Sequence, residues 1–257
     1  MANNASWSKI FKDYGILKHD FSKSPFDLSA EQIKTSCQKF TSVAQKEVRI
    51  LCKQDSRRDR PQVFIDNDLF LLPIKNGFYT IIKGEGYVDI PDIDSKVKSY
   101  DSKLDFKLDT SEIGDSEMQH LDFAYASSLI RTFMKDESLV LTIRGRKYTP
   151  GFSFNVGKQT INVQSVQTEV DAGYEGRDKI VLIEAKNSET DNTIIRQLFY
   201  PYKQWKTQTA KDVFLLFFEK RSNEYFIWQY SFKDENNYNS IVLVNSARYH
   251  IEGPNKI

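Results

Sequence analysis

The polar residues best suited to chemistry lie in two apolar runs that a turn separates. Glu169 and Asp171 belong to the first run, and Glu184 and Lys186 end the second. Neighbouring carboxylates repel one another, and burying an unpaired ion costs several kcal/mol. A divalent cation would offset that cost. Oxygen ligands suit a hard ion such as Mg²⁺, which also binds phosphate, so the pattern indicates a Mg²⁺ site.

The elements that must position these side chains have the pattern of a β-hairpin, with the tight turn at residues 177–178. In this register Asp171 falls opposite Glu184, and Glu169 falls opposite Lys186. Directly paired residues share one face of a sheet. Three carboxylates and one ammonium group are therefore expected together, and a shift of one residue would move them to the other face.

Each of these residues has an expected role in metal-assisted hydrolysis of a phosphodiester. Asp171 and Glu184 would hold the metal. Lys186 would orient or polarise the attacking water and stabilise the charge of the transition state. Glu169 would bind a second ion or restrain Lys186. A ladder of surface salt bridges is the alternative, but the apolar run 180–183 favours a buried strand with functional residues at its end.

The spacing Glu169-x-Asp171, a turn and then Ile183-Glu184-Ala-Lys186 resembles the PD-(D/E)XK nuclease superfamily. One departure is Val170, which stands where the name of the superfamily has proline. Further segments make most of the chain similar to bacterial type II restriction endonuclease-like proteins. These segments are Thr142-Ile-Arg-Gly-Arg146, Ile195-Arg-Gln-Leu-Phe-Tyr-Pro-Tyr202, Trp7, Ile10-Phe11, Tyr14-Gly-Ile16, Ile33-Lys34 and Leu72-Pro-Ile74.

The resemblance implies a type II restriction endonuclease, which hydrolyses phosphodiester bonds of specific double-stranded DNA with Mg²⁺. It implies no ATP requirement and a companion DNA methyltransferase that protects host DNA. It also implies that a helix beside the catalytic strands carries supporting residues, among which Gln197 would support the water. Because two-fold dimers usually read symmetric sites, a homodimer is expected.

Two other functions remain open at this point. The first is a structure-specific repair or recombination nuclease of the same fold, such as a junction resolvase, which would nick branched DNA. The second is a non-catalytic DNA-binding regulator. Intact Asp171, Glu184 and Lys186 argue against the regulator, because a decayed site is free to lose them.

Basic residues near the predicted site are the candidates for DNA contact. Arg144, Arg146 and Lys147 are expected between the first two strands, next to the catalytic sheet, where they would neutralise phosphates or grip guanine edges. A solvated turn is the alternative. Arg196 follows the Lys186 strand by a short connection, so we expect it to reach the same site.

The order of apolar runs predicts an α/β (α+β) protein with a restriction-endonuclease-like core, in which helices flank a mixed β-sheet. We expect an N-terminal helix and hairpin region at 1–95, a polar linker at 96–117 and the nuclease core at 118–257. The hairpin should turn at Asn76-Gly77. The N-terminal region is either a winged-helix-like DNA reader or a helical cap on the core.

Details of the helices follow from local signals. Ser29 and Gln32 have the spacing of a capping box. One helix is expected over 118–135, and a second should end near Tyr200 because Pro201 follows.

Composition supports a globular protein but does not identify a partner. The 257 residues are 40% hydrophobic, and the formal net charge is +1, which neither supports nor excludes DNA binding. Cys37 and Cys52 are too few for a disulfide framework. The sequence shows no signal peptide and no apolar run that could span a membrane, so a cytoplasmic protein is expected.

Overall fold

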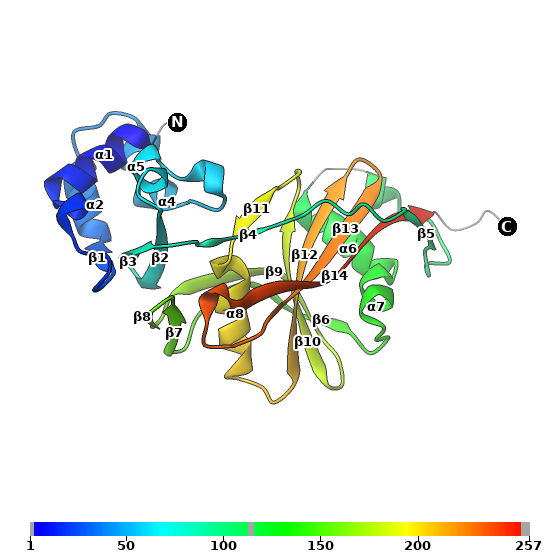
Figure 1. The fold of residues 1–257 in the computed structure, drawn as a ribbon. Coiled ribbons are helices and arrows are strands. Elements are labelled where there is room, and N and C mark those ends of the chain that lie inside the picture. The colour runs from blue at the N-terminus through cyan, green and yellow to red at the C-terminus, as the bar shows by residue number, and fades with distance from the viewer. Residues whose placement is uncertain (1–2, 113–115, 253–257) are drawn as a thin grey trace.

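The computed structural model describes residues 3–112 and 116–252 and shows a mixed α/β protein with several sheets (Figure 1). The general α+β class is therefore confirmed. Residues 1–2 of the expected N-terminal region, 113–115 of the expected linker and 253–257 of the expected core lie outside the described residues.

The N-terminal region packs short helices around its own apolar cluster and a three-stranded sheet of order β1-β3-β2. In this cluster the Trp7 ring meets Phe64 edge to face at 4.8 Å between centroids. The elements are α1 (Asn4–Asp13), η1 (Ile16–Lys18), β1 (Phe26–Ser29), α2 (Ala30–Cys37), α3 (Val43–Lys46), α4 (Val48–Leu51), η2 (Arg57–Asp59), α5 (Gln62–Ile65), β2 (Leu69–Lys75) and β3 (Phe78–Lys83).

Two local predictions for this region are confirmed. The Ser29 side chain accepts the Gln32 backbone N–H, and the Gln32 side chain accepts the Ser29 backbone N–H, which is a complete capping box. Strands β2 and β3 form the hairpin around residues 76–77, and Gly77 has a φ of +75°, which a side chain would strain.

An extended segment carries the chain from the N-terminal region along the rest of the molecule (Figure 1). In it, β4 (Tyr87–Asp89) pairs antiparallel with β11 (Asn192–Ile194), and β5 (Lys98–Asp101) pairs with β14 of the large sheet. Residues 96–117, expected as a linker, thus contribute β5 and η3 (Asp109–Glu112).

The large sheet has seven strands in the order β5-β14-β13-β12-β10-β9-β6. The pairs β10–β12 and β14–β5 are parallel, and the others are antiparallel. The remaining strands are β6 (Val140–Tyr148), β7 (Phe152–Val156), β8 (Gln159–Val163), β9 (Gln167–Glu175), β10 (Lys179–Lys186), β12 (Asp212–Arg221), β13 (Glu224–Phe232) and β14 (Ile241–Glu252). The hairpin β7–β8 forms a separate small sheet, and η4 (Tyr238–Ser240) lies between β13 and β14.

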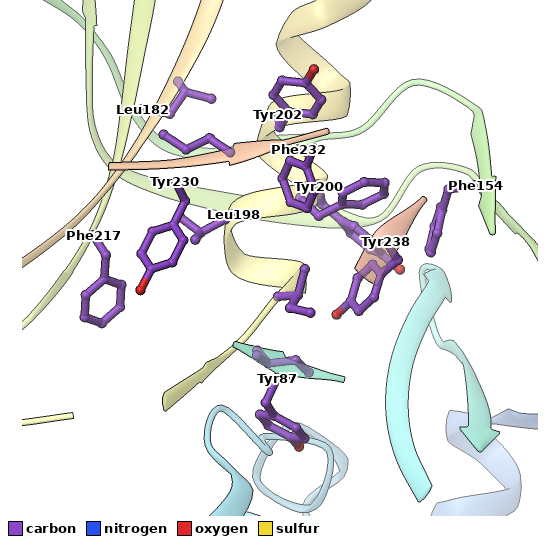
Figure 2. Close-up of a cluster of buried hydrophobic side chains, with 14 of the residues drawn as sticks. Tyr87, Phe154, Leu182, Leu198, Tyr200, Tyr202, Phe217, Tyr230, Phe232 and Tyr238 are labelled. Atoms are coloured by element: carbon purple, nitrogen blue, oxygen red, sulfur yellow. The ribbon is translucent and has the colours of Figure 1, made fainter. Parts of the chain in front are cut away.

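Helices cover both faces of this sheet, which explains why β10 is apolar almost throughout. Val181 and Ile183 pack in the cluster that includes α6 (Glu117–Ala126) and α7 (Leu129–Met134), whereas Leu182 faces α8 (Arg196–Lys206). Figure 2 shows the second cluster, where Leu198, Tyr200 and Tyr202 of α8 meet aromatic side chains of β13 and η4. The buried Glu184 and the partly exposed Lys186 lie at the end of this strand, which helices cover on both faces.

Three local expectations were wrong. The helix expected over 118–135 is broken between α6 and α7, because the Ser127 hydroxyl bonds the Ala124 carbonyl and Ser128 adopts a left-handed φ of 66°. The helix expected to end near Tyr200 instead runs through Pro201 to Lys206. Burial of the side chains on both sides of Pro201 outweighs the lost hydrogen bond, which costs about 3 kcal/mol.

The basic run from Arg144 to Lys147 was also misplaced. It lies within β6 and pairs with β9, and does not connect two strands. The pairing shifts register next to Gly145, whose φ is +84°, so the glycine marks a β-bulge.

Across residues 3–112 and 116–252, every helix is too short or too polar to cross a bilayer.

Candidate active site in the cleft between the hairpin strands and the N-terminal region

The hairpin β9–β10 has the predicted register. Glu175 pairs with Ile180 and Ala172 with Ile183, and the Gly176 N–H donates to the Lys179 carbonyl at 2.8 Å. Continuing this register by one residue puts Asp171 opposite Glu184.

The regular β9–β10 backbone pairing stops at that point, and a side-chain hydrogen bond connects the two strands beyond it. Oδ2 of Asp171 accepts the Ala185 backbone N–H at 2.8 Å. Nζ of Lys186 donates to Oε1 of Glu184. Asp171 is thus fixed to the strand that carries Glu184 and Lys186, and the three charged groups are held as one cluster.

This cluster opens into a polar cleft of about 670 Å³. All five residues predicted as catalytic line this cleft: Asp171, Glu184, Lys186, Glu169 and Gln197. The opposite wall comes from α4, the segment after it and the β2–β3 hairpin. The cleft therefore lies between the N-terminal region and the large sheet.

Burial gives the carboxylates unusual proton affinities. Burial, with a smaller contribution from the Asp171 charge and against the opposing charge of Lys186, raises the pKa of Glu184 to about 7. Burial also raises the pKa of Asp171, against the Ala185 hydrogen bond and the Lys186 charge. For Lys186, burial lowers the pKa, but the Glu184 charge and hydrogen bond outweigh it, so the pKa lies above its usual value.

Glu169 and Gln197 have different immediate partners from the central cluster. Glu169 forms an ion pair with Arg146 at 3.1 Å, across the β6–β9 ladder, and more than half of its side chain is exposed. Gln197 accepts the Thr193 hydroxyl at 2.5 Å through Oε1. Its amide nitrogen therefore remains able to donate into the cleft.

The residues predicted to contact DNA separate into two groups. Arg146 and Arg196 line the cleft, and Arg196 lies 3.6 Å from Asp55. Arg144 instead pairs with Asp122, and Nζ of Lys147 lies 4.8 Å from the Trp205 ring centroid. Neither Arg144 nor Lys147 is among the cleft-lining residues of the described chain.

The donor set at the centre of the cleft fits a hard cation that keeps several of its waters. Asp171 and Glu184 supply oxygen ligands only. The one ammonium group beside them, that of Lys186, pairs with the buried Glu184, whereas the half-buried Asp171 has the Ala185 N–H as its hydrogen-bond donor. In the part of the chain that the structure describes, no three His, Cys, Asp or Glu side chains form a metal-binding group. The protein thus offers two carboxylates, and water would complete the coordination of such an ion.

Sequence reasoning missed several residues of the cleft, namely Arg49, Lys53, Lys75 and Glu117. Glu117 begins α6 and accepts the Asn187 N–H at 3.1 Å, just beyond β10. The signal for Lys75 was its place beside Asn76-Gly77, but only the fold shows that this hairpin tip lines the same cleft as the carboxylates.

Comparison with known proteins gives a family but no described activity. Searches among curated proteins and among solved structures found no match. Residues 4–81 match the domain of unknown function DUF6996, and residues 82–250 match the domain of unknown function DUF6997. Since the second match covers well over half of the chain, the protein belongs to the DUF6997 family.

Proposed function

We propose that the protein is a nuclease of type II restriction type, which hydrolyses phosphodiester bonds of double-stranded DNA at specific sequences with Mg²⁺. The observation that carries this proposal is the convergence of Asp171, Glu184 and Lys186 in one polar cleft. Two acidic oxygen donors beside an amine suit a cation bound against a phosphate.

Each residue of the cleft has a separate role in the proposed hydrolysis. Asp171 and Glu184 hold the metal, which when bound polarises the phosphate and lowers the pKa of a water. Lys186, fixed by Glu184, orients the attacking water and stabilises the developing negative charge. Gln197, held by Thr193, uses its amide nitrogen to position that water. Arg146 and Arg196 bind phosphates at the edge of the cleft.

The surrounding fold supports the same proposal. A mixed sheet covered by helices on both faces, with the acidic residues at the end of one of its central strands, is consistent with a restriction-endonuclease-like core. We extend the proposal to a homodimer, because symmetric sites are usually read by two-fold dimers. The resemblance to restriction endonucleases further implies a companion DNA methyltransferase, and we propose that both act in the cytoplasm.

The direct test is incubation of the purified protein with unmethylated phage DNA and with supercoiled plasmid, in Mg²⁺ and in EDTA. Discrete, reproducible fragments in Mg²⁺ alone support a sequence-specific endonuclease. Nicking confined to a branched four-way junction would reassign the site to a structure-specific nuclease. Intact DNA in every Mg²⁺ reaction would contradict the proposal.

A further inference from the structure

The wall of the cleft that faces the carboxylates carries an excess of positive charge. It contributes Arg49, Lys53 and Lys75, against one carboxylate, Asp55. Asp55 already lies 3.7 Å from Lys53 and 3.6 Å from Arg196. Its charge is therefore shared between two cations and is not available to the others.

Arg49 and Lys75 are the cations of this wall that the protein leaves available. Both side chains are exposed, and neither forms an ion pair with any carboxylate of residues 3–112 or 116–252. Nζ of Lys75 lies 5.9 Å from the centroid of the exposed Phe78 ring, within reach of a cation–π contact. Two unpaired cations across a cleft from a candidate metal site are placed to bind an anion that spans it.

The hairpin that carries Lys75 is fixed from three sides. The Gly77 carbonyl accepts the Ala30 N–H at 2.7 Å, and the Ile74 carbonyl accepts the Gln164 N–H at 2.9 Å. The Pro73 carbonyl accepts the Tyr200 hydroxyl at 2.9 Å. Tyr200 belongs to α8, which also carries Arg196 and Gln197, so the hairpin tip and the catalytic wall share a support.

We propose that Arg49 and Lys75 bind the phosphate backbone of the nucleic acid whose reacting phosphate lies at Asp171 and Glu184. The N-terminal region is then half of the substrate site and not a cap. Asn76, which lines the cleft beside Lys75, supplies an amide that donates to the same backbone. This inference rests on the proposed nuclease function, which it deepens by assigning the opposite wall to substrate binding.

The test is binding of a short fluorescein-labelled DNA duplex, measured by fluorescence anisotropy in EDTA over a series of salt concentrations. The catalytic background is Glu184→Gln, so that no cleavage interferes. Adding Arg49→Ala and Lys75→Ala should weaken binding about tenfold or more at low salt and reduce the slope of log K against log salt by about two. Lys34→Ala is the matched control, because Lys34 is an exposed lysine of α2 outside the cleft, and it should change neither quantity.

The outcomes separate this inference from the proposed function. Unchanged affinity and salt slope in the double variant, with binding by the parent, would overturn the inference alone. Weakened binding without Mg²⁺-dependent cleavage by the wild type would support the inference and remove the proposed catalysis. Absence of duplex binding by the parent would overturn both. Equal melting temperatures of the variants show that a loss of binding is not a loss of folding. As an independent variant, Lys75→Glu reverses the charge and should weaken binding as well.

Discussion

At the scale of single residues, the site combines a buried and a half-buried carboxylate with one amine, and this combination is unfavourable without a further positive charge. Glu184 is only 8% exposed and forms an ion pair with Lys186, while one oxygen of Asp171 accepts the Ala185 N–H. The desolvation cost of ionising both carboxylates is larger than the attraction that one ammonium group provides. A bound divalent cation would remove this cost. Since a proton also removes it, a proton and a metal ion compete for the same carboxylate oxygens.

This competition predicts a pH-dependent effect of Mg²⁺ on stability. In the folded, metal-free protein the pKa of Glu184 is raised to about 7, so its proton stabilises the fold at low pH and that contribution is lost as pH rises through 7. Mg²⁺ binds the ionised form. The increase in melting temperature caused by Mg²⁺ should therefore be small at pH 6 and clearly larger at pH 8, as measured by thermal melts with and without the ion.

The control for this experiment is Glu184→Gln, which removes the titrating ligand. Its Mg²⁺-induced shift should be smaller than that of the wild type at pH 8 and nearly independent of pH. An equal Mg²⁺ shift at both values of pH in the wild type would show that Glu184 does not hold the ion.

The sequence allowed the central residues to be predicted but not their neighbours. Asp171, Glu184 and Lys186 follow from a local register, which residue spacing determines. The partner of Glu169, Arg146, depends on strands β6 and β9, which meet only in the folded chain. The partner of Gln197, Thr193, is four residues away, but it depends on the turn from β11 into α8. Long-range charges such as Arg49 carry no local pattern, so no spacing could identify them.

At the scale of elements, the β9–β10 hairpin depends on a close approach between strands. A Cβ added at Gly173 would lie 2.7 Å from Cβ of Ile143 in β6, so the strands would have to move apart. Gly173 is two residues from Asp171, and such a movement would displace the carboxylate from the Ala185 N–H.

Gly173→Ala should therefore lower the free energy of unfolding by about 1–3 kcal/mol, measured by urea denaturation. Gly151→Ala is the matched control, because its added Cβ would meet its nearest atom, the Val163 carbonyl oxygen, at an ordinary 3.9 Å. Equal stability of the two variants would show that β6 and β9 have room to separate and that the close contact is unimportant.

Elements that follow from local alternation were predictable, whereas those set by tertiary packing were not. Hairpin β2–β3 and the capping box at Ser29 depend on neighbouring residues. The continuation of α8 through Pro201 depends on the buried aromatic cluster that Figure 2 shows around Tyr200 and Tyr202, because packing outweighs the local preference.

At the scale of the whole molecule, the N-terminal region and the core share buried surface. Leu69 and Leu71 of β2 belong to the N-terminal cluster, while Phe70 and Leu72 belong to the cluster that contains α8. The Phe70 ring stacks on Tyr238 at 6.0 Å between centroids. Strand β2 is thus buried on both faces, and the boundary between the two matched domains, at residues 81–82, falls inside its partner β3.

A shared core predicts that the two regions open together. In native-state hydrogen exchange, the slowest amides of β2 and β3 should report the same free energy of opening as those of β12, within about 1 kcal/mol. Phe70→Ala should lower the free energy of opening of the β2 and β3 amides and that of the β12 amides by a similar amount, about 3–5 kcal/mol. Full protection of β12 in a variant whose β2 amides exchange freely would show two independent units.

The central claim is that Asp171, Glu184 and Lys186 catalyse hydrolysis of DNA with Mg²⁺. Its most direct test is the cleavage rate of unmethylated phage DNA by wild type, Glu184→Ala, Lys186→Ala and Glu175→Gln, each first shown to be folded and to bind duplex DNA. Glu175 is the control, because it lies at the far end of β9 and pairs with Lys211. The account predicts that the first two variants lose cleavage, by roughly a thousandfold or more, while Glu175→Gln cuts like the wild type. Near wild-type cleavage by either Glu184→Ala or Lys186→Ala would contradict it.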